Sequence, residues 1–187
     1  AISEGYYDLE TIVLLLAGMY LCRIKQVEHL KHHSPGELGK IFGLDRVPEV
    51  GVLRKKLKEI IAQGHASEWN KDLARKWVSE EENTLFYVDG HVQVYSGYLA
   101  NLGRKHVARL QLCMPGMMEF WVSNAFGAPY FVITGEVNEK LGEILESKII
   151  PQLIKDVALP VSEADLEADP DLPRFTIVFD REGYSPK

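Results

Sequence analysis

Two short stretches decide the fold: LFYVDGHVQVYSG at residues 85–97 and RFTIVFDREGYS at residues 174–185. Each is an apolar run that ends in an aspartate, Asp89 in the first and Asp180 in the second, at a point where a strand is expected to stop. An aspartate at a strand end is often only a turn residue. If the two strands are neighbours in one sheet, however, their carboxylates come together and make a metal site.

The sequence between these stretches predicts a hairpin followed by a long helix. Residues 119–124 and 129–134 are expected to pair across a turn that contains Gly127. Asn138 is expected to cap the helix, which Pro151 should kink or split because proline lacks a backbone donor. The apolar stripe of this helix comprises Leu141, Ile144, Leu145, Ile149, Leu153 and Ile154.

The predicted order is therefore strand, strand, strand, helix, strand. A long crossover helix between strands of one sheet implies parallel pairing, which returns the strand at 174–179 beside the strand at 84–88. Asp89 and Asp180 would then lie at the same edge of the sheet. Two carboxylates suit Mg²⁺ or Mn²⁺, and such ions promote in-line phosphoryl transfer.

Composition is that of a globular protein with one large or two small domains, at 187 residues with 46% hydrophobic and 26% charged. Cys22 and Cys113 stand outside any disulfide or zinc-finger spacing, which favours a reducing cytosol. The apolar block at residues 12–22 is about half of a membrane span, and no basic residue precedes it. We therefore expect no membrane segment and a cytoplasmic protein.

The N-terminal sequence predicts helices. Residues 8–27 are expected to form one apolar helix. The stretch SPGELGKIFG then carries the signals of a helix start: Ser34 can cap, proline follows in the first turn, and Glu37 closes a capping box. Gly43 is expected to end this helix about two turns later.

Two further helices are predicted. One runs from Pro48 to Gly64 and the other over residues 67–78. Their apolar positions are Val50, Leu53, Leu57, Ile60 and Ile61 in the first, and Trp69, Leu73 and Trp77 in the second. We therefore divide the chain into a helical region at 1–79 and a sheet domain at 80–187.

Basic residues suggest where DNA would bind, although the formal net charge is -6. Two short helices joined by about five residues resemble a helix-turn-helix, with Arg46, Arg54, Lys55 and Lys58 on or beside the second helix. The alternative is a helical bundle with a solvated basic face. A second basic group, which precedes the hairpin, consists of Arg104, Lys105 and Arg109. A single arginine, Arg181, follows Asp180. Contact with the DNA backbone and a solvated surface are both open for them.

The stretches YVDGHVQVYSG and FTIVFDREGYS resemble the first and second aspartate motifs of bacterial insertion-sequence DDE transposases. The order of elements is similar to the ribonuclease H-like fold, and SPGELGKIFGLDRVPEVGVLRKKLKEI resembles the helical segment before the catalytic core of such proteins. The resemblance covers nearly the whole chain. It implies an α/β protein, with a helix-turn-helix-like region before a partial ribonuclease H-like sheet, in which Asp89 and Asp180 are catalytic ligands of Mg²⁺ or Mn²⁺. The family's third carboxylate comes from a later helix, so the sequence, which ends at Lys187, resembles the front part of a longer transposase.

Other candidate residues have competing interpretations. His91 shares the strand face of Asp89 and can contact a phosphate or be a bystander. Three histidines near residue 30 include a pair with the i, i+4 spacing of metal ligands on a helix, but we expect them in a loop; they are His29, His32 and His33. Glu136 and Glu139 can act as ligands or pair with a helix dipole, whereas Glu182 lies too close to Asp180 along the chain to act as a separate ligand.

The leading interpretation is DNA transposition: cleavage at a transposon end, followed by strand transfer into target DNA. Because the third acid is missing, we expect this chain alone to be largely inactive and not to cut DNA efficiently. The alternatives are a non-catalytic DNA-binding fragment and a stand-alone ribonuclease H-like nuclease. The expected partner is DNA, at transposon ends and at the target, which implies a nucleoid-associated bacterial protein. A homo-oligomer is left open, and no membrane partner is expected.

Overall fold

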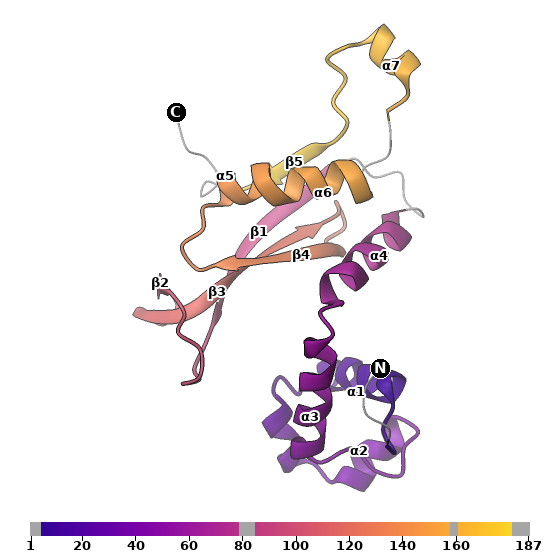
Figure 1. Ribbon diagram of the computed structural model, residues 1–187, viewed down its shortest axis with the longest axis vertical. Coiled ribbons are helices and arrows are strands. Elements are labelled where there is room, and N and C mark those ends of the chain that lie inside the picture. The colour runs from indigo at the N-terminus through magenta and orange to yellow at the C-terminus, as the bar shows by residue number, and fades with distance from the viewer. Residues whose placement is uncertain (1–4, 79–84, 158–160, 181–187) are drawn as a thin grey trace. The chain divides into compact units, whose positions relative to one another are not determined.

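The computed structural model describes residues 5–78, 85–157 and 161–180. By internal contacts the chain divides into two compact units, residues 1–66 and 67–187. In its described part the protein has seven α-helices and five strands (Figure 1). The α/β class expected from the sequence is therefore confirmed.

In the part of the first unit that the structure describes, the regular elements are all helices. Its elements are α1 (Leu9–Leu21), the 3₁₀ helix η1 (Val27–His32), α2 (Pro35–Ile41) and α3 (Val50–Ala62). Each contributes apolar side chains to one core, whose members are Ile12, Leu15, Met19, Ile24, Leu30, Leu38, Val47 and Leu53. The apolar spacing read from the sequence produces this core, except that Ile61, expected within it, is 75% exposed.

Helix α1 is shorter than the sequence predicted. Asp8 caps its start, and the Asp8 carboxylate accepts a hydrogen bond of 2.8 Å from the Thr11 backbone N–H. Its end is set by Cys22, the C-cap, and by Arg23, which adopts a left-handed backbone conformation with φ 58°. The prediction of one helix over residues 8–27 is therefore wrong beyond Leu21, because apolar content alone carries no signal for this turn.

Helices α2 and α3 begin near the predicted positions. Ser34 is the N-cap of α2, but its side chain makes no capping hydrogen bond, so the expected capping box does not form. The connection to α3 spans residues 42–49 and is longer than expected. Here the chain passes close to α2: a Cβ on Gly39 would lie 2.6 Å from the Arg46 Cα. Gly43, with φ 69°, lies in the turn, as its position in the sequence predicted.

The second unit is built on a mixed sheet. Its strands are β1 (Leu85–Val94), β2 (Arg104–Val107), β3 (Leu112–Ser123), β4 (Pro129–Glu136) and β5 (Thr176–Phe179). Strand β1 lies between β3, which is antiparallel to it, and β5, which is parallel. The first part of β3 pairs with β2 and the later part with β4, both antiparallel. The parallel return of the last strand beside β1 was predicted and is confirmed.

Strand β2 was not predicted, because the sequence RKHV is short, basic and without apolar alternation. The predicted β3–β4 hairpin is confirmed, with Gly127 at φ 80° in its turn. The turn is fixed by Asn124, whose buried side-chain oxygen accepts hydrogen bonds from the backbone N–H groups of Phe126 (3.0 Å) and Ala128 (2.8 Å).

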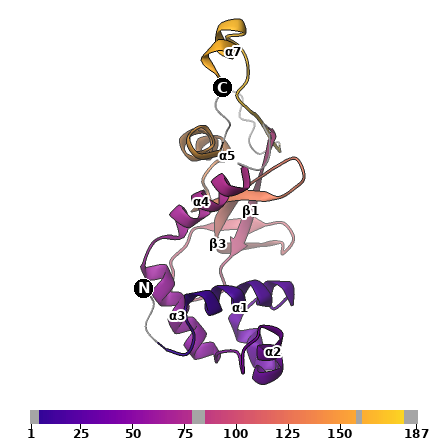
Figure 2. The ribbon, with the colours of Figure 1, turned by 90° about the vertical axis from the view of Figure 1, so that its right-hand side faces the viewer.

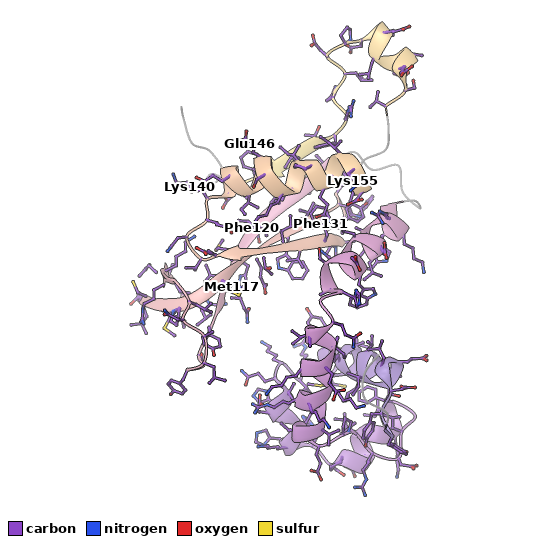
Figure 3. The ribbon with its side chains drawn as sticks, in the orientation of Figure 1. Met117, Phe120, Phe131, Lys140, Glu146 and Lys155 are labelled. Carbon is purple, nitrogen blue, oxygen red and sulfur yellow. The ribbon has the colours of Figure 1, made fainter. Side chains whose placement is uncertain are left out.

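One long helical segment crosses the sheet between β4 and β5. It comprises α5 (Leu141–Ile144), α6 (Ile150–Gln152) and two π-helical turns, η2 (Leu145–Ile149) and η3 (Leu153–Val157). In Figures 1 and 2 it covers one face of the sheet. Figure 3 labels Phe120 and Phe131, which lie in the core beneath it, and Glu146, which points away from the sheet.

The π-helical turns follow from the apolar spacing. Leu141, Leu145, Ile149, Leu153 and Val157 are buried and recur every fourth residue. In an α-helix of 3.6 residues per turn this row would drift by about 40° at each step, and wider π turns keep it against the sheet. The chain stays helical through Pro151 instead of splitting, the N-cap is Lys140 rather than Asn138, and the predicted core residue Ile154 is 49% exposed.

Two more helices belong to the second unit. Helix α4 (Ala66–Val78) buries Ala74 in the core of this unit, although the sequence-based division placed this helix with residues 1–79. Its Arg75 forms an ion pair of 2.5 Å with Asp156 on the crossover segment, and this contact raises the pKa of the guanidinium. Helix α7 (Glu163–Ala168), capped by Ser162, lies in the acidic stretch before β5, where the sequence predicted no helix.

Candidate functional site

Asp89 lies on the face of the sheet that the crossover segment does not cover. Along β1, Phe86 and Val88 point into the core, whereas Tyr87, Asp89 and His91 alternate onto the exposed face. Asp89 is in the middle of β1 rather than at its end, because the strand continues to Val94. The shared face of Asp89 and His91 is as the sequence predicted.

Asp180 follows β5 directly. The parallel register pairs Val88 with Phe179, so Asp89 and Asp180 are the next residue on each strand. Each aspartate therefore follows a residue of the last printed β1–β5 pair, and the meeting of their carboxylates stays a prediction. Among residues 5–78, 85–157 and 161–180, no group of three or more His, Cys, Asp or Glu side chains is arranged to hold a metal ion.

The exposed face contains two neighbours of Asp89 that the sequence interpretation did not single out. Trp121 lies directly across from Asp89 on β3, and Glu119 lies across from His91. The Trp121 indole N–H donates a hydrogen bond of 3.3 Å to the Glu119 carboxylate, which fixes the orientation of the ring. The alternation of side chains in EFWVS carried this signal, since it puts Glu119 and Trp121 on one face.

The basic residues of the β2–β3 hairpin have different roles. Arg104 donates a hydrogen bond of 2.8 Å to the Cys113 carbonyl, and the Lys105 ammonium lies 3.8 Å from the Met118 sulfur. Both contacts hold the hairpin together. Arg109 lies in the turn between the two strands and is exposed. Of these three predicted DNA contacts, Arg109 is therefore the one most accessible to a phosphate.

The four predicted DNA-binding residues of the first unit are all exposed. Arg46 precedes α3, and Lys55 and Lys58 lie on its outer side. Arg54 forms an ion pair with Glu28 on η1, so its charge is already partly compensated. Lys56, which the sequence interpretation passed over, is only 5% exposed and belongs to the interior.

The histidines near α2 do not lie in a loop as expected. His29 and His32 are on η1, where residues three apart lie above one another, and their ring centres are 6.1 Å apart. His33 follows as the C-cap and, with Lys31, borders a mostly apolar cavity of about 400 Å³ at the start of α3.

Glu139 has a structural role. Its carboxylate accepts a hydrogen bond of 2.8 Å from the Glu136 backbone N–H and another of 3.4 Å from Lys148, which ties the end of β4 to the crossover segment. The remaining two predicted residues, Arg181 and Glu182, lie outside the described residues.

Comparison with known proteins identifies the family. A family model described as "Transposase protein" matches residues 1–187. The chain belongs to this transposase family. A search of curated proteins and a search of solved structures each gave no match.

Membership of the transposase family indicates the kind of molecule on which the protein acts. A transposase acts on DNA, so a role in transposition follows for a chain that matches the family over residues 1–187. In the part of the transposase that the structure describes, no helix is long and apolar enough to span a membrane.

Proposed function

We propose that this chain carries out DNA transposition by metal-dependent phosphoryl transfer at transposon ends, with Asp89 and Asp180 as acidic ligands. The parallel pairing of β1 with β5 carries the proposal, because its register ends at Val88 and Phe179, the residues directly before the two aspartates. Family membership supports the same conclusion. The order of three antiparallel strands, a crossover helix and a parallel strand supports assigning the sheet to the ribonuclease H-like fold.

Asp89 and Asp180 are the residues that would hold Mg²⁺ or Mn²⁺, because carboxylate oxygens are the donors that these ions prefer. When bound, such an ion compensates the charge of a reacting phosphate. Asp89 lies on a strand paired on both sides, which gives its carboxylate a rigid base. His91 on the same face is placed to contact a phosphate oxygen. We further propose that efficient cleavage requires another carboxylate from outside the described residues.

The basic residues would position the DNA. Arg46, Lys55 and Lys58 are exposed in the first unit, and Arg109 is exposed at the hairpin turn of the second. Lysine and arginine bind phosphates of any sequence, so these residues would contribute affinity rather than sequence preference. Arg54, Arg104 and Lys105 would contribute less, because each already makes a contact within the protein.

Cleavage of a transposon-end duplex in the presence of Mn²⁺ tests the catalytic part. We expect weak nicking by this chain and its loss in Asp89→Asn and Asp180→Asn, whereas Asp171→Asn, an exposed aspartate before β5, retains it. Robust nicking without strand transfer would favour a stand-alone nuclease, and DNA binding without any nicking would favour a non-catalytic DNA-binding fragment.

Metal binding can be followed without activity. Trp121 lies across from Asp89, so its indole should sensitise the luminescence of Tb³⁺, a probe for hard cations, bound at this face. The signal should fall in Asp89→Asn and Asp180→Asn and when Mg²⁺ competes. Trp121→Phe should remove the signal without removing Mn²⁺-dependent nicking. A signal unchanged by both aspartate substitutions would place the ion elsewhere.

DNA affinity measured against salt concentration tests the positioning part. Each lost phosphate contact should lower the slope of log K against log salt by about 0.9. Replacing Arg46, Lys55 and Lys58 together with alanine should therefore lower it by about three units. Arg75→Ala serves as the matched control, since Arg75 is engaged with Asp156. An unchanged slope in the triple variant would show that these residues form only a solvated surface.

A further inference from the structure

Helix α1 exposes apolar side chains on the side that faces away from its own core. Ile12, Leu15 and Met19 are buried against the first unit. The opposite side presents what we call the α1 stripe: Leu9, Val13, Leu14, Ala17, Tyr20 and Leu21, all exposed, with Tyr20 at 86% and Leu21 at 83%. At 100° per residue these positions fall within about 140° of one another on the helix. They therefore form a continuous surface.

An ordinary surface helix pairs an apolar face with a polar one. Helix α1 does not, because its sequence LETIVLLLAGMYL contains Glu10 as its one charged residue. A helix that is apolar on all sides is normally buried on all sides. Large exposed apolar patches mark surfaces that bind a partner.

We propose that the α1 stripe binds the same stripe of a second copy of this chain, with the two α1 helices antiparallel. Charges at the two ends of the helix select this partner and this direction. Asp8 and Glu10 lie at its start, and Arg23 and Lys25 follow its end, all four exposed. An antiparallel pair brings the acidic start of each helix to the basic end of the other. A parallel pair would place like charges together at both ends.

The composition of the stripe also suits a helix pair. Ala17 lies near the middle of the exposed side, where a small side chain lets two helix backbones approach. Tyr20 and Leu21 lie towards one end, and in an antiparallel pair they would cover Leu9 of the partner. A lipid surface fits less well, because helices that lie on membranes carry basic residues along the border of the apolar face. Here the helix carries no basic residue, and its one charged residue, Glu10, lies among the stripe positions in the first turn.

Sedimentation velocity of the full chain over a wide concentration range tests the proposal. We expect a concentration-dependent dimer, and we expect Leu14→Glu and Leu21→Glu each to weaken it about tenfold or more, as for a residue central to an interface. The control is Ile61→Glu on α3, since Ile61 is also exposed but lies outside the stripe. A chain that remains monomeric, or a dimer that both stripe variants leave intact, overturns the proposal.

Charge reversal tests the antiparallel direction and does not depend on the apolar variants folding well. Glu10→Lys and Arg23→Glu should each weaken the dimer, and the double variant should restore it. A parallel pair predicts no restoration, which would overturn the geometry. Flotation with anionic lipid vesicles covers the membrane alternative: vesicle binding by a monomeric chain, lost in Leu14→Glu, would replace the proposal.

Discussion

Gly39 shows how a single residue can reverse an ordinary expectation. In an exposed helix interior alanine is more stable than glycine by about 1 kcal/mol. In α2, however, the Cβ of Gly39→Ala would meet the Arg46 backbone, with the Cα at 2.6 Å, and backbone atoms cannot rotate away. We therefore expect Gly39→Ala to lower the free energy of unfolding by about 1–3 kcal/mol, measured by urea denaturation.

Gly51 in α3 is the matched control. A Cβ at this position has no atom within 4 Å, so Gly51→Ala should be neutral or stabilise the protein by up to about 1 kcal/mol. If both variants shift stability in the same direction by similar amounts, the close approach of α2 to Arg46 is not a constraint on the fold.

At the level of single residues, the sequence was most informative where a chemically reactive side chain stands at a recognisable position in a predicted strand or turn. Asp89 and Asp180 could be singled out because each ends an apolar run. The role of a basic side chain could not be predicted in this way, since it depends on contacts made across the fold. Arg104 bonds to a carbonyl, Arg54 pairs with Glu28, and Lys56 is buried, yet all three look like surface cations in the sequence.

At the scale of the element, the start of α1 depends on one carboxylate. The hydrogen bond from Thr11 lowers the pKa of Asp8 in the folded protein. In the unfolded chain the pKa of an aspartate is about 3.9. Because the pKa of Asp8 is lower in the folded protein, its ionised carboxylate stabilises the fold fully above the unfolded pKa. This stabilisation is lost as the pH falls through the pKa of the folded protein. We expect Asp8→Asn to lower the melting temperature at neutral pH, and the difference from the wild type to shrink at acid pH.

Thermal unfolding followed by circular dichroism at several pH values measures this effect. Asp171→Asn, in the loop before β5, is the control and should leave the acid dependence of the wild type unchanged. A melting-temperature difference for Asp8→Asn that stays constant from neutral to acid pH would show that the charge of the cap does not matter.

Elements with strong local signals were predicted, and elements set by distant contacts were not. Apolar spacing located α3, α4 and the crossover segment, and the turn at Gly127 located the β3–β4 hairpin. Strand β2 forms because it can pair with the first part of β3, and the sequence RKHV does not reveal this pairing. The π turns around Pro151 follow from packing against the sheet, whereas the sequence at Pro151 predicts only a break.

At the scale of the whole molecule, the sequence predicted a helical part followed by a sheet part, and contacts place the division between residues 66 and 67. The difference concerns α4. Its apolar spacing, which includes Trp69 and Trp77, had suggested an amphipathic helix of the first part, but both tryptophans are exposed. The residue that anchors it is the small Ala74, which is fully buried in the core of the second unit. A buried alanine gives a weak sequence signal, so the choice of unit could not be predicted.

The two units have separate cores, and this predicts that a core substitution acts on one unit only. Leu53 is fully buried in the first core and Ile149 in the second, and the two cores share no residue among those described. Leu53→Ala and Ile149→Ala should each lower the free energy of unfolding by about 2–5 kcal/mol in the unit that contains the cavity.

Native-state hydrogen exchange read by mass spectrometry reports on the two units separately. We expect Leu53→Ala to lower amide protection in α1, α2 and α3 while β1, β3 and β4 keep theirs, and Ile149→Ala to give the opposite pattern. Equal loss of protection in both units after either substitution would mean that the chain unfolds as one cooperative body.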